Sequence, residues 1–211
     1  MYLPAHFAET RGEVLHAAMR AHPFATLVAH GEGGLRADHL PLHFAAGVGP
    51  CGALQGHVAR ANPLWRKAAD TDVLVIFHGP QTYITPSWYE TKREHGKAVP
   101  TWNYVVVHAR GRLRAIDDPA WLRMQLESLV AQHEAGFAEP WRISDAPPDY
   151  IEKMLAAIVG IEIVISEVTG KWKTSQNQPA ANRAGVVAGL REQGRDDALH
   201  MAELVARIPA R

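Results

Sequence analysis

The stretch from Val73 to Ile116 carries more aromatic rings and cations than ordinary turns require. Two runs of β-branched and apolar residues flank a polar loop, which predicts two strands joined by a loop that carries the aromatic and cationic side chains. Rings beside positive charges suit a flat, partly charged ligand, although such rings also pack barrel cores and subunit interfaces. The residues concerned are Tyr83, Trp88, Tyr89, Lys92, Arg93, Lys97, Trp102 and Tyr104.

Two further polar stretches follow predicted strands. Residues Lys171 to Gln178 bring together cations, amides and an indole after the strand Gly160 to Val168, which indicates a ligand-facing strand end. Residues Gly56 to Trp65 place Asn62 as the N-cap of a short helix with proline at its first position. The N–H groups of that helix start, beside Arg60, form either an anion site or an ordinary capped turn with a solvated arginine.

Metal, nucleophile and nucleotide chemistries each lack a required part. His39 and His43 share one face of a strand, but no third or fourth ligand accompanies them, so no metal site is predicted. Cys51 is the single cysteine, which excludes an internal disulfide, and no cationic neighbour in the sequence activates it. The chain contains no phosphate-binding P-loop, nucleophile elbow or dinucleotide fingerprint.

The composition is typical of a globular protein. Of 211 residues, 47% are hydrophobic, which suffices for a core without indicating a membrane span, and one domain over residues 1–211 is expected. The 22 basic residues match 22 acidic ones, so DNA binding would need a local positive patch. The single cysteine and an N-terminus without a signal-peptide pattern predict a reducing, cytoplasmic location.

Hydrophobic periodicity and turn residues predict a mainly β fold with peripheral helices. Proline cannot donate to a ladder, so the strand that contains Pro41 is expected to be at an edge or bulged. Short strands without strand–helix alternation favour a small antiparallel barrel of the α+β class. The predicted strands are Phe24 to Ala29, Leu35 to Phe44, Ala53 to Val58, the two runs within Val73 to Ile116, and Gly160 to Val168, with a hairpin turn at His30 to Gly34. The predicted helices are Glu9 to Ala21, Ala120 to Ala135 after an Asp118 cap, Tyr150 to Ile158, Arg183 to Arg191 and Asp196 to Ile208, so the C-terminal helices begin at about residue 182.

Five motifs occur in order along the chain. They are HLPL at His39 to Leu42, GHVARANPLW at Gly56 to Trp65, GPQTYITPSWY at Gly79 to Tyr89, VPTWNYVVVHARG at Val99 to Gly111 and KWKTSQNQP at Lys171 to Pro179. Over Met1 to Leu190 the chain thereby resembles the PaiB family, the FMN-binding negative transcriptional regulators. The resemblance implies a split-barrel flavin-binding fold, similar to that of pyridoxamine-phosphate oxidases, and a homodimer with FMN lodged between the subunits.

Together with what FMN needs from a protein, the resemblance assigns residues to parts of the cofactor. The candidates for the phosphate are His57, Arg60 and Asn62, with Lys97 as a second partner. The backbone of His39, Leu40 and Pro41 is expected at the edge of the flavin ring, with Trp102, Asn103 and Tyr104 closing the other side. Residues expected to reach across from the partner subunit are Lys171, Lys173, Ser175 and Gln176.

Three functions remain open at the level of sequence. The first is a flavin-binding dimer that represses transcription directly or indirectly. The second is a flavin-dependent reductase or oxidase for a small substrate, with no catalytic residue identified. The third is haem binding with His39, His43 or His57 as axial ligand. Against direct DNA contact, the C-terminal helices mix acidic residues with Arg183, Arg191, Arg195, Arg207 and Arg211, which favours a packing role.

Overall fold

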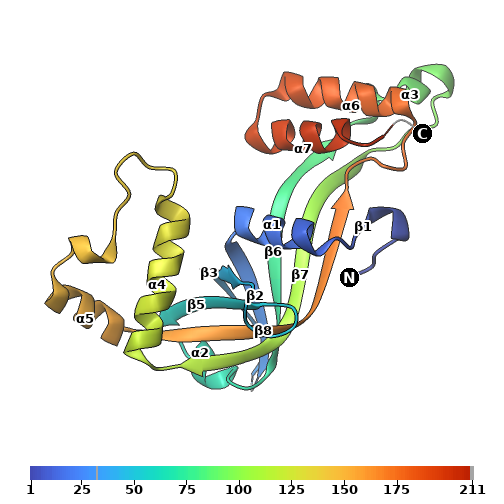
Figure 1. Cartoon of the computed structure of the whole chain (residues 1–211). Helices are drawn as coiled ribbons and strands as arrows, with labels where there is room; N and C mark the ends of the chain where they lie inside the picture. The colour runs from blue at the N-terminus through green and yellow to red at the C-terminus, as the bar shows by residue number, and fades with distance from the viewer. Residues whose placement is uncertain (32, 210–211) are drawn as a thin grey trace. The chain divides into compact units, whose positions relative to one another are not determined.

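A computed structural model describes residues 1–31 and 33–209 of the chain (Figure 1). Within that part the strands form one sheet in the order β3-β2-β6-β7-β8-β5-β4, and β1 pairs with β8. The strands are β1 Ala8–Glu9, β2 Phe24–Gly31, β3 Gly34–Pro41, β4 His43–Ala45, β5 Ala53–Ala59, β6 Asp72–Ile84, β7 Thr101–Ile116 and β8 Ile158–Lys173. The helices are α1 Gly12–Ala21, α2 Leu64–Lys67, α3 Glu90–His95, α4 Pro119–Glu134, α5 Pro148–Ala156, α6 Ala180–Gln193 and α7 Asp196–Ala206, with short 3-10 helices η1 Ala5–Phe7, η2 Pro86–Trp88 and η3 Ile143–Asp145. Glu32 of the predicted hairpin turn and Arg211 lie outside the described residues.

The chain divides into two compact units. The first unit consists of Met1–Leu15, His78–Val107 and the chain from Thr169 onward. The second unit consists of His16–Phe77 and His108–Val168. The long strands β6, β7 and β8 each contribute residues to both units. The expectation of a single domain over residues 1–211 stays a prediction.

The β2–β3 hairpin of the second unit shows what proline does to a strand. Phe24 pairs with Pro41 in antiparallel register, and β3 stands first in the sheet order, so Pro41 lies in an edge strand as predicted. The prediction of one strand from Leu35 to Phe44 is wrong. β3 ends at Pro41, and β4 begins at His43, which pairs with Gln55 of β5. The missing N–H of proline gives the chain a place to leave one partner strand for another.

Long strands run further than the apolar pattern predicts. β6 continues through Gly79 and Pro80 to Ile84, and β8 continues past Val168 to Lys173. Glycine and proline are usual strand breakers, and the end of β8 is polar, so the pattern predicts loops there. The correction matters because it places two of the polar motifs on strands, where side chains alternate between two faces.

The side of β6 that is buried changes along the strand. Phe77 is buried in the second unit, whereas Thr82 and Ile84 are buried in the first. Because side chains on a strand alternate with a period of two, this shift from odd to even positions turns the buried face over. Gly79 lies at the change, and a Cβ added there would stand 2.9 Å from the Cβ of Val105. Glycine therefore allows the close approach of β7 at this point.

The predicted helices exist, with some corrections at their ends. The Asp118 cap of α4 is confirmed, since its Oδ1 accepts a hydrogen bond from the backbone N–H of Ala120 at 2.8 Å. α1 begins at Gly12 rather than at Glu9, because Glu9 pairs with Gly170 in the short strand β1. α5 and α6 begin earlier than predicted, and α7 ends earlier.

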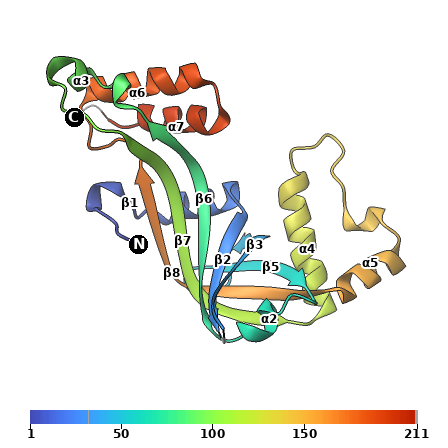
Figure 2. The same cartoon turned by 180° about the vertical axis from the view of Figure 1, so that it is seen from behind.

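The helices α6 and α7 lie side by side in the first unit (Figure 2). Trp88 packs against the glycine face of α6, where a Cβ on Gly185 would stand 1.9 Å from the carbonyl oxygen of Trp88. A Cβ on Gly189 would stand 2.2 Å from Cε2 of the same indole. The two glycines thus let the indole and the helix backbone touch. The buried cluster that they border contains Ile84, Tyr89, Val186, Leu190, Ala198, Met201, Ala202 and Val205.

Candidate functional site

The start of β7 and the end of β8 lie next to each other in the sheet of the first unit and join several of the predicted residues. The amine of Lys173 donates to the hydroxyl of Thr101 and, at 2.8 Å, to the carbonyl oxygen of Trp102. The amide nitrogen of Asn103 donates to the hydroxyl oxygen of Ser175 at 2.9 Å. We call this group the β7–β8 cluster; it comprises Thr101, Trp102, Asn103, Tyr104, Lys171, Lys173, Ser175 and Gln176.

Lys171 is held among aromatic rings. Its amine lies 5.6 Å from the ring centroid of Tyr2 and 5.3 Å from that of Tyr104, and it donates to the backbone carbonyl of Tyr2 at 3.0 Å. Only 7% of the residue is exposed. Cation–π contact compensates part of the desolvation of such a cation. Within the described chain, the ion pairs include no carboxylate partner for Lys171 or Lys173.

The surroundings of Lys173 disfavour its charged form. Burial, and then the positive charge of Lys171, lower the pKa of Lys173 below its ordinary value. Both causes act in the same direction, since each disfavours the ammonium form. A negatively charged ligand at this position would favour the ammonium form and so raise this pKa.

A tight turn after β8 sets the amide and hydroxyl groups of the cluster. Ser175 is buried and has a φ of +69°, a left-handed conformation that is uncommon for residues other than glycine. Gln176 braces the turn, because its Oε1 accepts from the N–H of Thr174 at 2.8 Å and its Nε2 donates to the carbonyl of Trp172. Asn103 is 1% exposed, and its Oδ1 has no hydrogen-bond partner. An unpaired buried acceptor is costly and marks the cluster as unusual.

Beside these polar groups, two aromatic rings of the first unit are exposed. Trp102 is 47% exposed and Tyr83 is 44% exposed, with their ring centroids 6.0 Å apart in an edge-to-face arrangement. The indole N–H of Trp102 donates to Oε1 of Gln81 at 2.6 Å, which fixes the ring. Lys97, after α3, is exposed, and its backbone N–H donates to Nδ1 of His95 at 3.1 Å.

The other predicted residues belong to the second unit. Nδ1 of His39 lies 3.1 Å from the hydroxyl oxygen of Thr26, and Nδ1 of His57 lies 3.1 Å from Oε1 of Gln125. Leu40 and Pro41 end β3, and the carbonyl oxygen of Pro41 approaches β5 at Gly56, where an added Cβ would stand 3.0 Å away. The second unit therefore brings the HLPL and GHVARANPLW motifs together.

Arg60 ties parts of the second unit together. Its guanidinium makes two hydrogen bonds of 2.7 Å to the carboxylate of Asp117, one of 2.7 Å to the carbonyl of Ala156 and one of 3.0 Å to the carbonyl of Ile158. A guanidinium has five N–H donors, so protein partners occupy four of them. The phosphate role of Arg60 stays a prediction, and binding there would compete with these partners.

Asn62 makes the capping hydrogen bond that was predicted, although α2 begins at Leu64 and Pro63 stands at its N-cap position. Its Oδ1 accepts from the N–H of Leu64 at 2.9 Å and from Arg36 at 3.1 Å, while its Nδ2 donates to Asp38 at 2.9 Å. The guanidinium of Arg36 and then the amide of Asn62 hold the pKa of Asp38 below its ordinary value. Because α2 has only four residues, its helix dipole adds little to an anion site.

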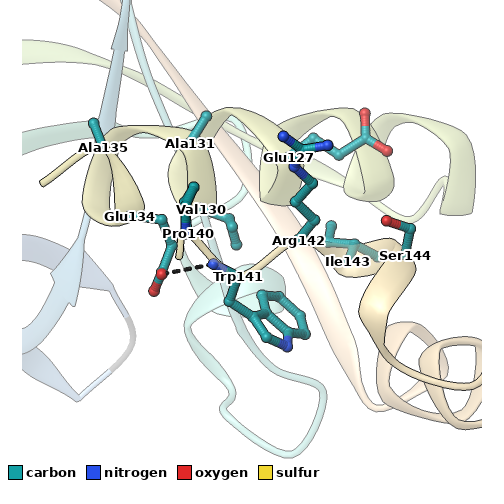
Figure 3. A pocket seen from close by; sticks show the side chains of 10 residues that line it. All are labelled: Glu127, Val130, Ala131, Glu134, Ala135, Pro140, Trp141, Arg142, Ile143 and Ser144. Carbon is teal, nitrogen blue, oxygen red and sulfur yellow. Dashed lines mark hydrogen bonds between the residues drawn. The ribbon is translucent and has the colours of Figure 1, made fainter. Parts of the chain in front are cut away.

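The second unit also contains a cavity of about 470 Å³ between the end of α4 and the following loop (Figure 3). The backbone N–H of Trp141 donates to Oε2 of Glu134 at 2.9 Å and ties the loop to the helix. None of the predicted flavin residues lines this cavity. No helix in the described part of the chain is long and apolar enough to cross a bilayer.

Comparison with known proteins identifies the family. Residues 1–167 match the family model described as "Putative FMN-binding domain". Protease synthase and sporulation protein PAI 2 of Bacillus subtilis is 34% identical, over 97% of this chain and 96% of that protein. This chain belongs to that PaiB-like family. An uncharacterized protein of Emericella nidulans is also 33% identical to this PaiB-like chain, again over 97% of the chain and 96% of the relative.

A solved structure supports the fold. The flavocytochrome Anf3 from Azotobacter vinelandii superposes with a TM-score of 0.59 and 18% identity, covering 79% of this chain and 69% of that one. At this identity the likeness concerns the fold alone. The predicted α+β split-barrel class is confirmed.

Sequence reasoning missed the partners of the predicted residues. Thr101, Gln81 and Tyr2 hold Lys173, Trp102 and Lys171 respectively, and none of the three was predicted. One signal could have placed Lys171 and Lys173 together, since residues two apart on a strand share a face. That signal applies only if β8 extends to Lys173, and the polar composition of the segment conceals this extension.

Proposed function

We propose that this protein is an FMN-binding homodimer and a negative transcriptional regulator of the PaiB type. The family match supports the FMN-binding part of the proposal. The observation that carries it is the β7–β8 cluster, in which the buried Lys171 and the half-buried Lys173 stand beside exposed aromatic rings and have no carboxylate partner among the described residues. Cations for a phosphate and rings for an isoalloxazine are the contacts that FMN needs.

The side-chain types in and beside the cluster match the chemical groups of FMN. Lys171 and Lys173 would hold an anion, Trp102 and Tyr83 offer ring surfaces, and Asn103 has a buried carbonyl oxygen without a partner. Bound FMN would supply reversible electron transfer, which a regulator can use as a signal. Gln81 would keep the indole of Trp102 oriented, through the hydrogen bond that it already accepts.

The exposed rings also support a second subunit. Aromatic side chains are enriched in the cores of subunit interfaces, and homodimers bury the same patch from both copies. Trp102 and Tyr83 are well ordered by contacts within one chain, so little side-chain entropy would be lost when a partner covers them.

The C-terminal helices favour indirect regulation. α6 and α7 pack along each other, and α7 opens with Asp196 and Asp197 in its first turn. In a helix-turn-helix the first turn of the recognition helix approaches the DNA, where two carboxylates would be repelled by phosphates. We therefore propose that the flavin-bound dimer acts through another macromolecule. A gel shift at two salt concentrations tests this, because specific binding that survives the higher salt would show direct contact.

The central experiment is a titration with FMN, followed by flavin fluorescence and combined with a sizing column. We expect saturation at one FMN per subunit and elution as a dimer. Trp102→Leu should lower the affinity about fivefold or more, because a ring contact is lost. Trp141→Leu is the matched control, since Trp141 is 43% exposed and lies outside the cluster. Failure of the unmodified protein to saturate at tens of micromolar FMN would refute the proposal.

A further inference from the structure

Lys171 and Lys173 form a pair on one strand. They are two residues apart in β8, and side chains with that spacing point to the same face. Their amines contact neighbouring positions, since Lys171 lies over the ring of Tyr104 and Lys173 donates to the carbonyl of Trp102. Two ammonium groups therefore converge on the start of β7.

The pair lacks neutralising groups in the described chain. The acceptors that the two amines reach are neutral, namely the carbonyls of Tyr2 and Trp102 and the hydroxyl of Thr101. Lys171 is buried and Lys173 is half-buried, and two like charges of which one is shielded from water destabilise the fold unless something compensates them. Protein structures rarely keep such a pair for packing alone, because replacing it by apolar residues removes the penalty.

We propose that Lys171 and Lys173 form a subsite for a terminal phosphomonoester, so that the protein selects FMN over riboflavin and over FAD. This inference rests on the proposed function and deepens it by naming the residues that choose the flavin. A phosphomonoester carries a charge of about −1.5 to −2 at neutral pH, which two ammonium groups match. Riboflavin has no phosphate, and each phosphate of FAD is a diester that carries one charge and offers fewer terminal oxygens.

The neighbouring polar groups complete the subsite. The hydroxyl of Ser175 accepts from Asn103, which leaves its own proton available to donate. The backbone turn around Ser175 is braced by the hydrogen bonds of Gln176, which limits how far this hydroxyl can move. The match to the family model covers residues 1–167, so the β7 residues of the subsite lie inside the matched domain, whereas Lys171, Lys173 and Ser175 follow it.

The test compares three flavins on one protein. FMN, riboflavin and FAD are each titrated by flavin fluorescence into the full chain and into Lys173→Gln. We expect the unmodified protein to bind FMN at least about tenfold more tightly than riboflavin or FAD, and Lys173→Gln to lose about tenfold for FMN alone. Lys153→Gln is the control, since Lys153 is exposed on α5, where it pairs with Asp149, and lies outside the β7–β8 cluster. A melting curve of each variant checks that it is folded.

The outcomes separate this inference from the proposed function. Equal affinity for FMN and riboflavin, or FMN affinity unchanged in Lys173→Gln, overturns the subsite while flavin binding stands. If no flavin binds, the proposed function fails, and the subsite is tested by inorganic phosphate. Phosphate should then raise the melting temperature of the unmodified protein and of Lys153→Gln, but not that of Lys173→Gln. An equal shift in all three would overturn the subsite.

Discussion

The contact between Trp88 and α6 can be tested by adding one methyl group. Gly189 lies inside α6, where alanine is favoured over glycine by about 1 kcal/mol in the absence of other contacts. In this structure the new Cβ would stand 2.2, 2.3 and 2.5 Å from three atoms of the Trp88 indole. Carbon atoms in contact are normally about 3.5–4.0 Å apart, so the indole or the helix must move.

The indole has little freedom to retreat. A Cβ on Gly185 would stand 1.9 Å from the carbonyl oxygen of Trp88, which shows that the backbone of η2 also rests on α6. Overpacking of this kind costs about 1–3 kcal/mol, and the rigid neighbours favour the upper end. After subtracting the gain in helix propensity, we expect Gly189→Ala to lower the free energy of unfolding by about 2 kcal/mol.

The assay is thermal unfolding followed by circular dichroism. A loss of about 2 kcal/mol corresponds to a fall in Tm of about 4–8 °C for a chain of this size. Gly136→Ala is the control, since a Cβ at Gly136 meets no atom within 4 Å, and its Tm should change little. In a Trp88→Ala background, Gly189→Ala should no longer destabilise the protein. An unchanged or higher Tm for the single variant would refute the packing of Trp88 on α6.

Two other changes follow from single polar groups. Tyr89 is 3% exposed, its hydroxyl has no hydrogen-bond partner, and burial raises its pKa. Tyr89→Phe removes the unpaired hydroxyl and should raise the free energy of unfolding by roughly 1 kcal/mol, as measured in urea; a loss would show that the hydroxyl is bonded. The pKa of Asp38 is lowered by Arg36, so its stabilising effect is present above the ordinary carboxyl value of about 3.9 and is lost as the pH falls through the lower folded-state value. Asp38→Asn should therefore lower Tm at neutral pH, and the difference from the unmodified protein should shrink in acid. A difference that is constant with pH would contradict this account.

Local rules predicted the features that depend on local chemistry. Asp118 and Asn62 accept hydrogen bonds from the N–H groups two residues further on, and Pro41 lies in an edge strand. Each of these outcomes is decided by residues close in sequence, which is why side-chain type and spacing suffice.

Long-range partners could not be predicted in this way. Asp117, the partner of Arg60, is 57 residues away, and nothing near either residue indicates their meeting. Lys173 and Thr101 are separated by 72 residues and meet only because β7 and β8 are neighbours in the sheet. Strand order is set by packing of the whole chain, so a pattern within one segment does not identify the strands that will be its neighbours.

One of the places where the strand predictions fail, the end of β8, coincides with the candidate site. β8 was predicted to stop at Val168 because the following residues are polar, yet Lys171 and Lys173 continue the strand. A strand built for packing alone would keep apolar residues at shielded positions, as β8 does at Val159, Ile161, Ile163 and Ile165. Polar residues that persist in a strand against its own pattern need another reason to be there. In this chain the reason we propose is a phosphate that two lysines, placed on one face by the pleat of β8, are positioned to hold.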